Sequence, residues 1–185
     1  MDLLRQTGFS VTSNPHLDRT ALVLDPAIAS RQTRLGGGPT PDVSRLPHFA
    51  EALSRWYPPH VHRVLWIDHW SNDFPSAYDL FVAARVGLGE TRSLSEAPGH
   101  YFDPHPYDER DQTRLSQEQA RQTGILVGLT SLAMISSWDG WLIAGGSSDR
   151  IEFWEGNIFF YSCERPRLTG AKSTMDEFGC PRDPV

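Results

Sequence analysis

The chain has 185 residues, of which 39% are hydrophobic and 22% are charged, so it has enough apolar side chains for one domain with a buried core. Seventeen basic residues against 23 acidic ones give a formal net charge of −6, which opposes binding to a nucleic-acid backbone or to an anionic membrane. No apolar run reaches the roughly 20 residues of a membrane-spanning helix, and residues 1–13 lack the pattern of a secretion signal, so we expect a cytoplasmic protein.

The first 41 residues predict a loosely structured N-terminal segment. Its one apolar run, residues 20–24, favours a short strand that ends at Asp25 and Pro26. Residues 35–41 contain three glycines and two prolines and predict a flexible connector. A glycine triplet cradles phosphate only where a helix follows directly, and Pro39 and Pro41 intervene here, so a phosphate loop is not favoured.

The middle of the chain predicts two helices and one strand. Residues 42–57 carry apolar side chains every three or four positions after a possible N-cap at Asp42 or Ser44, which predicts a helix. Residues 61–67 are rich in β-branched and aromatic side chains and predict a strand. Residues 76–86 predict a second helix, which Gly87 ends.

The next 50 residues predict a long loop followed by a long helix. Residues 90–114 are polar and interrupted by prolines, which is typical of a functional loop. Ser116 and Gln119 have the spacing of a capping box and predict the start of a helix that runs to about residue 136. Because residues 125–135 are apolar on nearly all sides, we expect this half of the helix to be buried.

The last quarter of the chain predicts three strands and a tail. Residues 141–144, 151–154 and 158–161 alternate with compact turns, which favours an antiparallel meander, and residues 164–185 contain prolines and glycines that favour an extended tail. Cys163 and Cys180 are expected to be free thiols. The whole chain therefore predicts one α+β domain over residues 1–185, an antiparallel sheet whose C-terminal meander packs against the long apolar helix and two further helices.

The acidic side chains are concentrated in residues 68–111, which we call the acidic segment. It holds nine acids and three arginines, and this difference of six equals the formal excess of the chain. Such a run is either a solvated face or a docking surface for a basic partner. For docking, the candidate contacts are Asp68, Asp73, Asp103, Asp108, Glu109 and Asp111, with Trp70 and Tyr107 as aromatic anchors.

Histidines suggest a different chemistry. Alternation along a strand would place His60 and His62 on one face, a spacing that metal sites use. A metal centre would need a third ligand from His69, His100 or His105, and the alternative is that these histidines serve only as hydrogen-bond partners. No GxSxG motif is present, Ser147 and Ser148 lie in a predicted turn, and no cofactor motif is found.

The acidic segment and the terminal run Trp138-Asp-Gly-Trp-Leu-Ile … Ile151-Glu-Phe-Trp-Glu-Gly-Asn-Ile-Phe-Phe-Tyr161 carry a resemblance. In size, acidity, missing export signal and α+β layout, the chain resembles the immunity proteins (antitoxins) of bacterial polymorphic-toxin and type VI secretion systems. The resemblance implies a protein without catalytic residues that binds one cognate toxin and covers its active site, often with carboxylates facing a basic groove. The alternatives are a small metal-dependent enzyme, such as a hydrolase centred on His60 and His62, and a structural or adaptor module.

Overall fold

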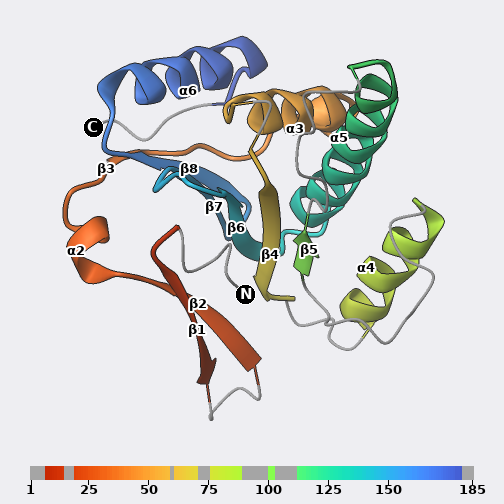
Figure 1. Ribbon diagram of the computed structural model, residues 1–185, viewed down its shortest axis with the longest axis horizontal. Helices are drawn as coiled ribbons and strands as arrows, with labels where there is room; N and C mark the ends of the chain where they lie inside the picture. The colour runs from red at the N-terminus through yellow and green to blue at the C-terminus, as the bar shows by residue number, and fades with distance from the viewer. Residues whose placement is uncertain are drawn as a thin grey trace.

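A computed structural model describes residues 7–14, 19–58, 61–70, 76–88, 100–102 and 112–180. In these ranges the chain forms a single α+β domain, as predicted: helices cover one face of a six-stranded sheet and a two-stranded hairpin lies on the other (Figure 1). We call these the inner face and the outer face. Among the described residues, no helix combines the length and the hydropathy that a membrane span requires.

The sheet has the strand order β3-β8-β7-β6-β4-β5, and every pair of neighbours is antiparallel. Its strands are β3 (Thr33–Leu35), β4 (Arg63–His69), β5 (His100–Phe102), β6 (Asp139–Ala144), β7 (Arg150–Trp154) and β8 (Asn157–Ser162). The predicted meander is thus confirmed as β6-β7-β8. Glu155 and Gly156 close its second hairpin with φ angles of 48° and 75°, the left-handed pair of a two-residue hairpin turn.

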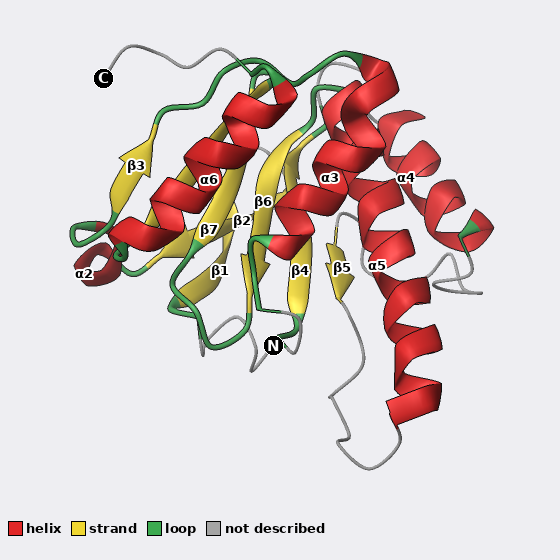
Figure 2. Ribbon diagram, turned by 90° about the horizontal axis from the view of Figure 1, so that it is seen from above, coloured by secondary structure: helices red, strands yellow, loops and turns green. Residues whose placement is uncertain are grey.

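Helices lie across the inner face of the sheet (Figure 2). The helices are α2 (Pro26–Ala29), α3 (Leu46–Arg55), α4 (Ser76–Gly87), α5 (Gln112–Ile135) and α6 (Arg165–Phe178), and a 3-10 turn, η1 (Val43–Arg45), precedes α3. Between α3, α5, α6 and the sheet lies the main core, in which Phe49, Leu65, Leu129, Leu142 and Phe160 are fully buried. The sheet and helices therefore bury one continuous apolar interior.

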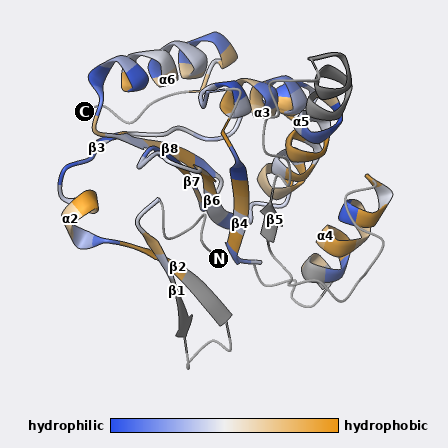
Figure 3. Ribbon diagram, viewed as in Figure 1, coloured by the Kyte–Doolittle hydropathy of each residue, from blue (hydrophilic) through white to orange (hydrophobic). Residues whose placement is uncertain are grey.

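The long helix α5 begins at Gln112, so Ser116 lies inside it and the predicted capping box is wrong as a helix start. The prediction of a buried second half is confirmed up to Met134, which is 4% exposed, whereas Ile135 is 52% exposed. This half of α5 is coloured as hydrophobic in Figure 3. It packs against α3 and α4, because its apolar side chains surround the helix and need cover from more than one side.

The predicted extended tail at residues 164–185 is wrong over most of its length, because Arg165–Phe178 form the helix α6. Leu168, Ala171, Met175 and Phe178 recur every three or four residues and pack on the main core. Pro166 lies in the first turn, where its missing N–H costs little, and Gly179 ends the helix with a φ angle of 70°. The proline and the glycine mark the two ends of this helix and do not break it.

The predicted loose N-terminal segment is also wrong for the described residues. The strand predicted at residues 20–24 is confirmed as β2 (Arg19–Leu24), and it pairs with β1 (Phe9–Asn14) as the outer hairpin. The glycine run after β3 lies against β8, where the Ile158 N–H donates to the Gly38 carbonyl. A Cβ on Gly37 would lie 1.3 Å from the Ile158 carbonyl oxygen, so this run contains glycine for close backbone contact.

Candidate functional site

The outer face of the sheet is divided into two halves. The hairpin β1-β2 covers β4 and β6, where a small second core contains Phe9, Leu22, Val64, Trp66 and Ile143. In Figure 1 this hairpin lies on the side of the sheet opposite α3 and α6. The other half carries polar and aromatic side chains of β6, β7, β8 and β3, described next.

Asp68 links the two halves of the structure on this face. The Trp66 Nε1–H donates to its Oδ1 and the Trp141 Nε1–H to its Oδ2, both at 2.6 Å, and the backbone of Leu22 donates a further hydrogen bond. Burial raises the pKa of Asp68 to about 6, and these hydrogen bonds together offset only part of that effect, while the charge of Glu152 adds to it. The carboxyl group therefore joins the hairpin to the sheet and titrates near neutral pH.

Arg150 lies in the row of outward-facing positions on β7 and contacts the ring of Trp141, the same indole that donates to Asp68. Its guanidinium carbon is 5.2 Å from the centroid of the Trp141 ring and 4.3 Å from that of the Tyr161 ring, so the cation lies against two aromatic faces. Only 8% of the residue is exposed, and burial lowers its pKa. In the described part of the chain, its Nε and Nη1 atoms have no hydrogen-bond acceptor.

Glu152, the carboxylate on β7, already accepts a hydrogen bond. The Tyr161 hydroxyl donates to Glu152 Oε2 at 2.5 Å, and Arg34 donates to the Tyr161 hydroxyl while lying 4.9 Å from the Phe159 ring centroid. Burial has the largest effect on Tyr161, and the hydrogen bond and charge of Glu152 add to it. Together they raise the pKa of Tyr161 to about 12, so this hydroxyl stays protonated at neutral pH. A cation, two aromatic rings and a hydrogen-bonded carboxylate thus lie together on the outer face.

Two predicted partner contacts have other roles in the structure. Trp70 is 6% exposed and packs edge to face against Phe81 and Trp138, with ring centroids 5.4 and 4.9 Å away, so it belongs to the main core and is not an anchor for a partner. Asp68 is half-buried and bonded to two indoles, so it is not a free surface carboxylate. The other predicted contacts lie outside the described residues: Asp73, Asp103, Tyr107, Asp108, Glu109 and Asp111.

The described histidines are not brought together. His62 and His69 flank opposite ends of β4, about 23 Å apart at the usual rise of a strand, which excludes a shared metal ion. His100 pairs in register with Trp66, about 13 Å along the strand from His62. His69 Nδ1 instead lies 3.7 Å from Asp139 Oδ2. No metal-binding group of three side chains occurs among the described residues, while His60 and His105 lie outside them.

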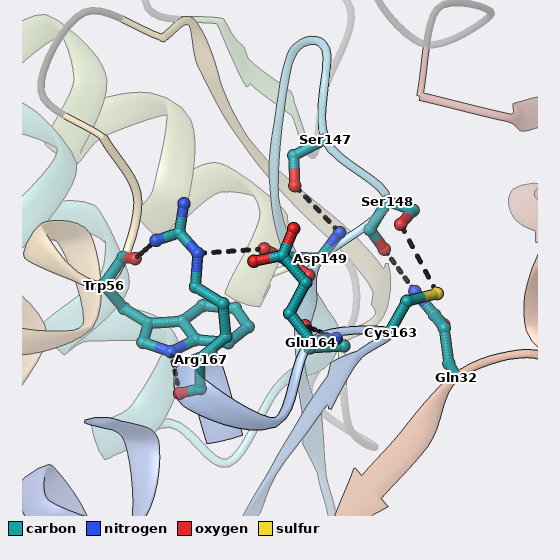
Figure 4. Close-up of polar contacts among 9 residues, drawn as sticks. Gln32, Trp56, Ser147, Ser148, Asp149, Cys163, Glu164 and Arg167 are labelled. Atoms are coloured by element: carbon teal, nitrogen blue, oxygen red, sulfur yellow. Dashed lines mark hydrogen bonds and ion pairs between the residues drawn. The ribbon is translucent and has the colours of Figure 1, made fainter. Parts of the chain in front are cut away.

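The serines and cysteines near the end of the sheet have structural partners (Figure 4). Cys163 is exposed and Cys180 is buried, and both are unpaired, as predicted. The Ser148 hydroxyl lies 3.9 Å from Cys163 Sγ, and Arg167 Nε lies 3.5 Å from Asp149 Oδ2. These contacts hold the β6-β7 turn against the start of α6.

An open groove of about 670 Å³ lies between α3 and α6. Its walls carry charges of both signs, including Arg55, Arg167, Glu51 and Glu177, and Arg55 donates to Glu51 at 2.5 Å. Because these charges are mixed and partly paired, the groove does not favour a ligand of one charge. The outer-face cluster around Arg150 is therefore the more specific candidate site.

The sequence predictions missed the outer-face cluster. The alternation of Arg150 with Glu152 on β7, and of Phe159 with Tyr161 on β8, already indicates one shared face. The burial of Arg150 has no such signal in the sequence, because an arginine in a strand is usually exposed.

Comparisons with protein-family models, with curated proteins and with solved structures gave no match for this chain.

Proposed function

We propose that this chain is an immunity protein, which binds a cognate bacterial toxin and covers the toxin's active site without catalysing a reaction. The observation that supports this most is the charge distribution: the acidic segment holds the whole formal excess of the chain. The described parts of that segment, which are the end of β4, the helix α4 and the strand β5, lie at one edge of the sheet (Figure 1). A basic groove on a partner is the complementary surface.

The proposed contacts are revised by burial. Asp68 and Trp70 are removed from the surface, and Asp79, which is exposed in the first turn of α4, is added. Arg85 is 4% exposed, so this arginine does not contribute to the surface either. Without Asp68 and Arg85 the acidic segment has eight acids and two arginines, and its excess of six acids remains. From the sequence, Asp73, Asp103, Asp108, Glu109 and Asp111 stay in the proposal as acidic contacts, with Tyr107 as the proposed aromatic anchor.

Such a surface would act in two ways. Its negative potential speeds the encounter with a basic partner, and this effect weakens as salt is added. Carboxylates that enter the active-site groove then compete with an anionic substrate for the same basic side chains. An aromatic side chain at the centre of the contact supplies affinity through apolar burial.

A neutralisation assay tests this proposal. The product of the neighbouring gene is expressed in a bacterial host with and without this protein, since immunity genes lie beside the genes of their toxins. We expect the neighbouring product to stop growth and this protein to restore it. A neighbouring product that remains equally toxic in the presence of this protein would contradict the proposal.

Charge reversal then tests the surface. The triple variant Asp108→Lys, Glu109→Lys, Asp111→Lys should lose protection and bind the toxin at least about tenfold more weakly, because attraction becomes repulsion. The matched control is Glu155→Lys, Glu164→Lys, Glu177→Lys, which changes the net charge equally at exposed positions outside the acidic segment. Equal weakening by both variants would show that net charge matters and the acidic segment does not.

A further inference from the structure

The guanidinium of Arg150 is held in a fixed position but is not neutralised by a bonded carboxylate. Two aromatic rings flank it at 4.3 and 5.2 Å, and 92% of the residue is buried, so it has little freedom to reach water. Nevertheless, Nε and Nη1 lack an acceptor among the described residues. A buried cation with unsatisfied donors costs free energy, and an anionic acceptor would recover that cost.

We propose that this part of the outer face is a binding site for a small monocarboxylate, with Arg150 as the residue that binds the carboxylate group. Trp141 and Tyr161 hold the guanidinium plane and form apolar walls beside it. This inference does not depend on the proposed function, because the site lies on described side chains outside the surface proposed for the toxin.

Glu152 does not fill this role, although it lies on the same strand and face. Its Oε2 accepts the Tyr161 hydroxyl, and that hydroxyl in turn accepts from Arg34. Among the described residues, neither Nε nor Nη1 of Arg150 has a hydrogen bond to Glu152. Glu152 therefore acts on Arg150 through its charge, which raises the pKa of Arg150 against the larger lowering by burial, but it leaves Nε and Nη1 without an acceptor among the described residues.

The neighbouring charges favour a carboxylate over a phosphate. Glu152 and the partly ionised Asp68 both lie close to this face, and each repels an incoming anion. A monoanion meets half the repulsion of a dianion, while a carboxylate still matches the planar donors of a guanidinium. The low exposure of Arg150 further restricts the ligand to a small molecule.

Nuclear magnetic resonance can follow this site directly. The Nε–H signal of Arg150 is assigned by its loss in the Arg150→Lys variant, and the intact protein is titrated with sodium acetate and sodium benzoate. We expect a saturable shift of this signal and of the Trp141 indole N–H, with a millimolar Kd, while sodium chloride at equal ionic strength causes no saturable shift. Sodium phosphate should bind at least about fivefold more weakly.

Two variants and a control separate binding from folding. Arg150→Lys should weaken the binding of acetate by about tenfold or more, because an ammonium group cannot reproduce the planar donors of a guanidinium. The Trp141 indole N–H signal measures this change. Glu152→Gln, which keeps Arg150, should tighten binding severalfold by removing a repelling charge. The control Arg165→Lys changes an exposed arginine at the start of α6 and should leave the Kd within about twofold.

Several results would overturn the proposal. One is an Arg150 Nε–H signal that does not respond to acetate or benzoate beyond the effect of sodium chloride. Another is an unchanged Kd in Arg150→Lys protein that remains folded by its thermal transition. If Arg150→Lys does not fold, an unchanged or weaker Kd in Glu152→Gln contradicts the site on its own.

Discussion

The two faces of the sheet are built from the same six strands but differ in what they bury. The inner face presents Leu65, Leu142, Ile151 and Phe160, all fully buried under helices, and its one described arginine on β4, Arg63, donates to backbone and side-chain oxygens of α3 and α5. The outer face places the carboxyl of Asp68 and the guanidinium of Arg150 among aromatic rings. Because burying charge costs free energy, the inner face serves stability and the outer face is where a binding role is expected. Four predictions test this difference.

The largest expected effect is on the inner face. Phe160→Ala should lower the free energy of unfolding by about 3–5 kcal/mol, since it removes a fully buried ring that packs edge to face on Trp56 at 5.2 Å. Phe159→Ala, one residue away on the outer face, should cost less than about 1 kcal/mol. Urea unfolding of both variants measures the difference, and similar losses would contradict the contrast between the faces.

The next effect is a pH dependence from Asp68 on the outer face. Since its folded pKa of about 6 exceeds its unfolded value of about 3.9, this group stabilises the fold fully below pH 3.9 and loses that contribution as pH rises through 6. Relative to Asp68→Asn, the intact protein should lose about 2 kcal/mol of unfolding free energy between pH 4 and pH 7. Urea unfolding across this range measures it, and a constant difference would exclude the buried carboxyl as a proton-sensitive link.

A smaller effect comes from the Tyr57 hydroxyl, which reaches the sheet from the inner side. Tyr57 donates to the Leu142 carbonyl at 2.5 Å, and burial raises the pKa of Tyr57 well above its ordinary value, so it remains a donor. Tyr57→Phe should lower the free energy of unfolding by about 1 kcal/mol. Chemical denaturation measures this, and a stabilised variant would show that the hydrogen bond is not favourable.

The smallest effect is expected at the exposed end of β7. Trp154 is 53% exposed, so Trp154→Ser should change the free energy of unfolding by less than about 0.5 kcal/mol. Thermal unfolding measures this change. A much larger loss would mean that the exposed part of the outer face contributes to stability as the inner face does.

Local patterns predicted most of the helices and strands correctly. The β6-β7-β8 meander and the helices α3 and α4 have strong periodicity and clear turns, which depend only on neighbouring residues. The helix α6 was missed because Pro166, Gly170 and Gly179 outweighed the spacing of Leu168, Ala171, Met175 and Phe178. The strands β1, β3 and β5, the last within the predicted loop of residues 90–114, were missed because a short strand is stable only when its partner is present.

The sequence predicted the residues of the candidate site less well than it predicted the fold. The acidic segment was visible as a charge difference, and yet the sequence could not distinguish Asp68, which is bonded to two indoles, from acids that lie on a surface. Trp141, one of those partners, is 73 residues away in the sequence. Likewise, only burial separates Arg150 from an ordinary exposed arginine of a strand.

The sequence by itself determined the acidic character of the chain, the α+β class and the order of its strongest elements, because charge, periodicity and turn residues act over a few positions. Only the tertiary structure decided which acids are buried, which aromatic side chains form the core, and that Arg150 lies between two rings without a bonded carboxylate. These properties depend on which strands pair and which face each helix covers, and such contacts join residues that are far apart in the chain.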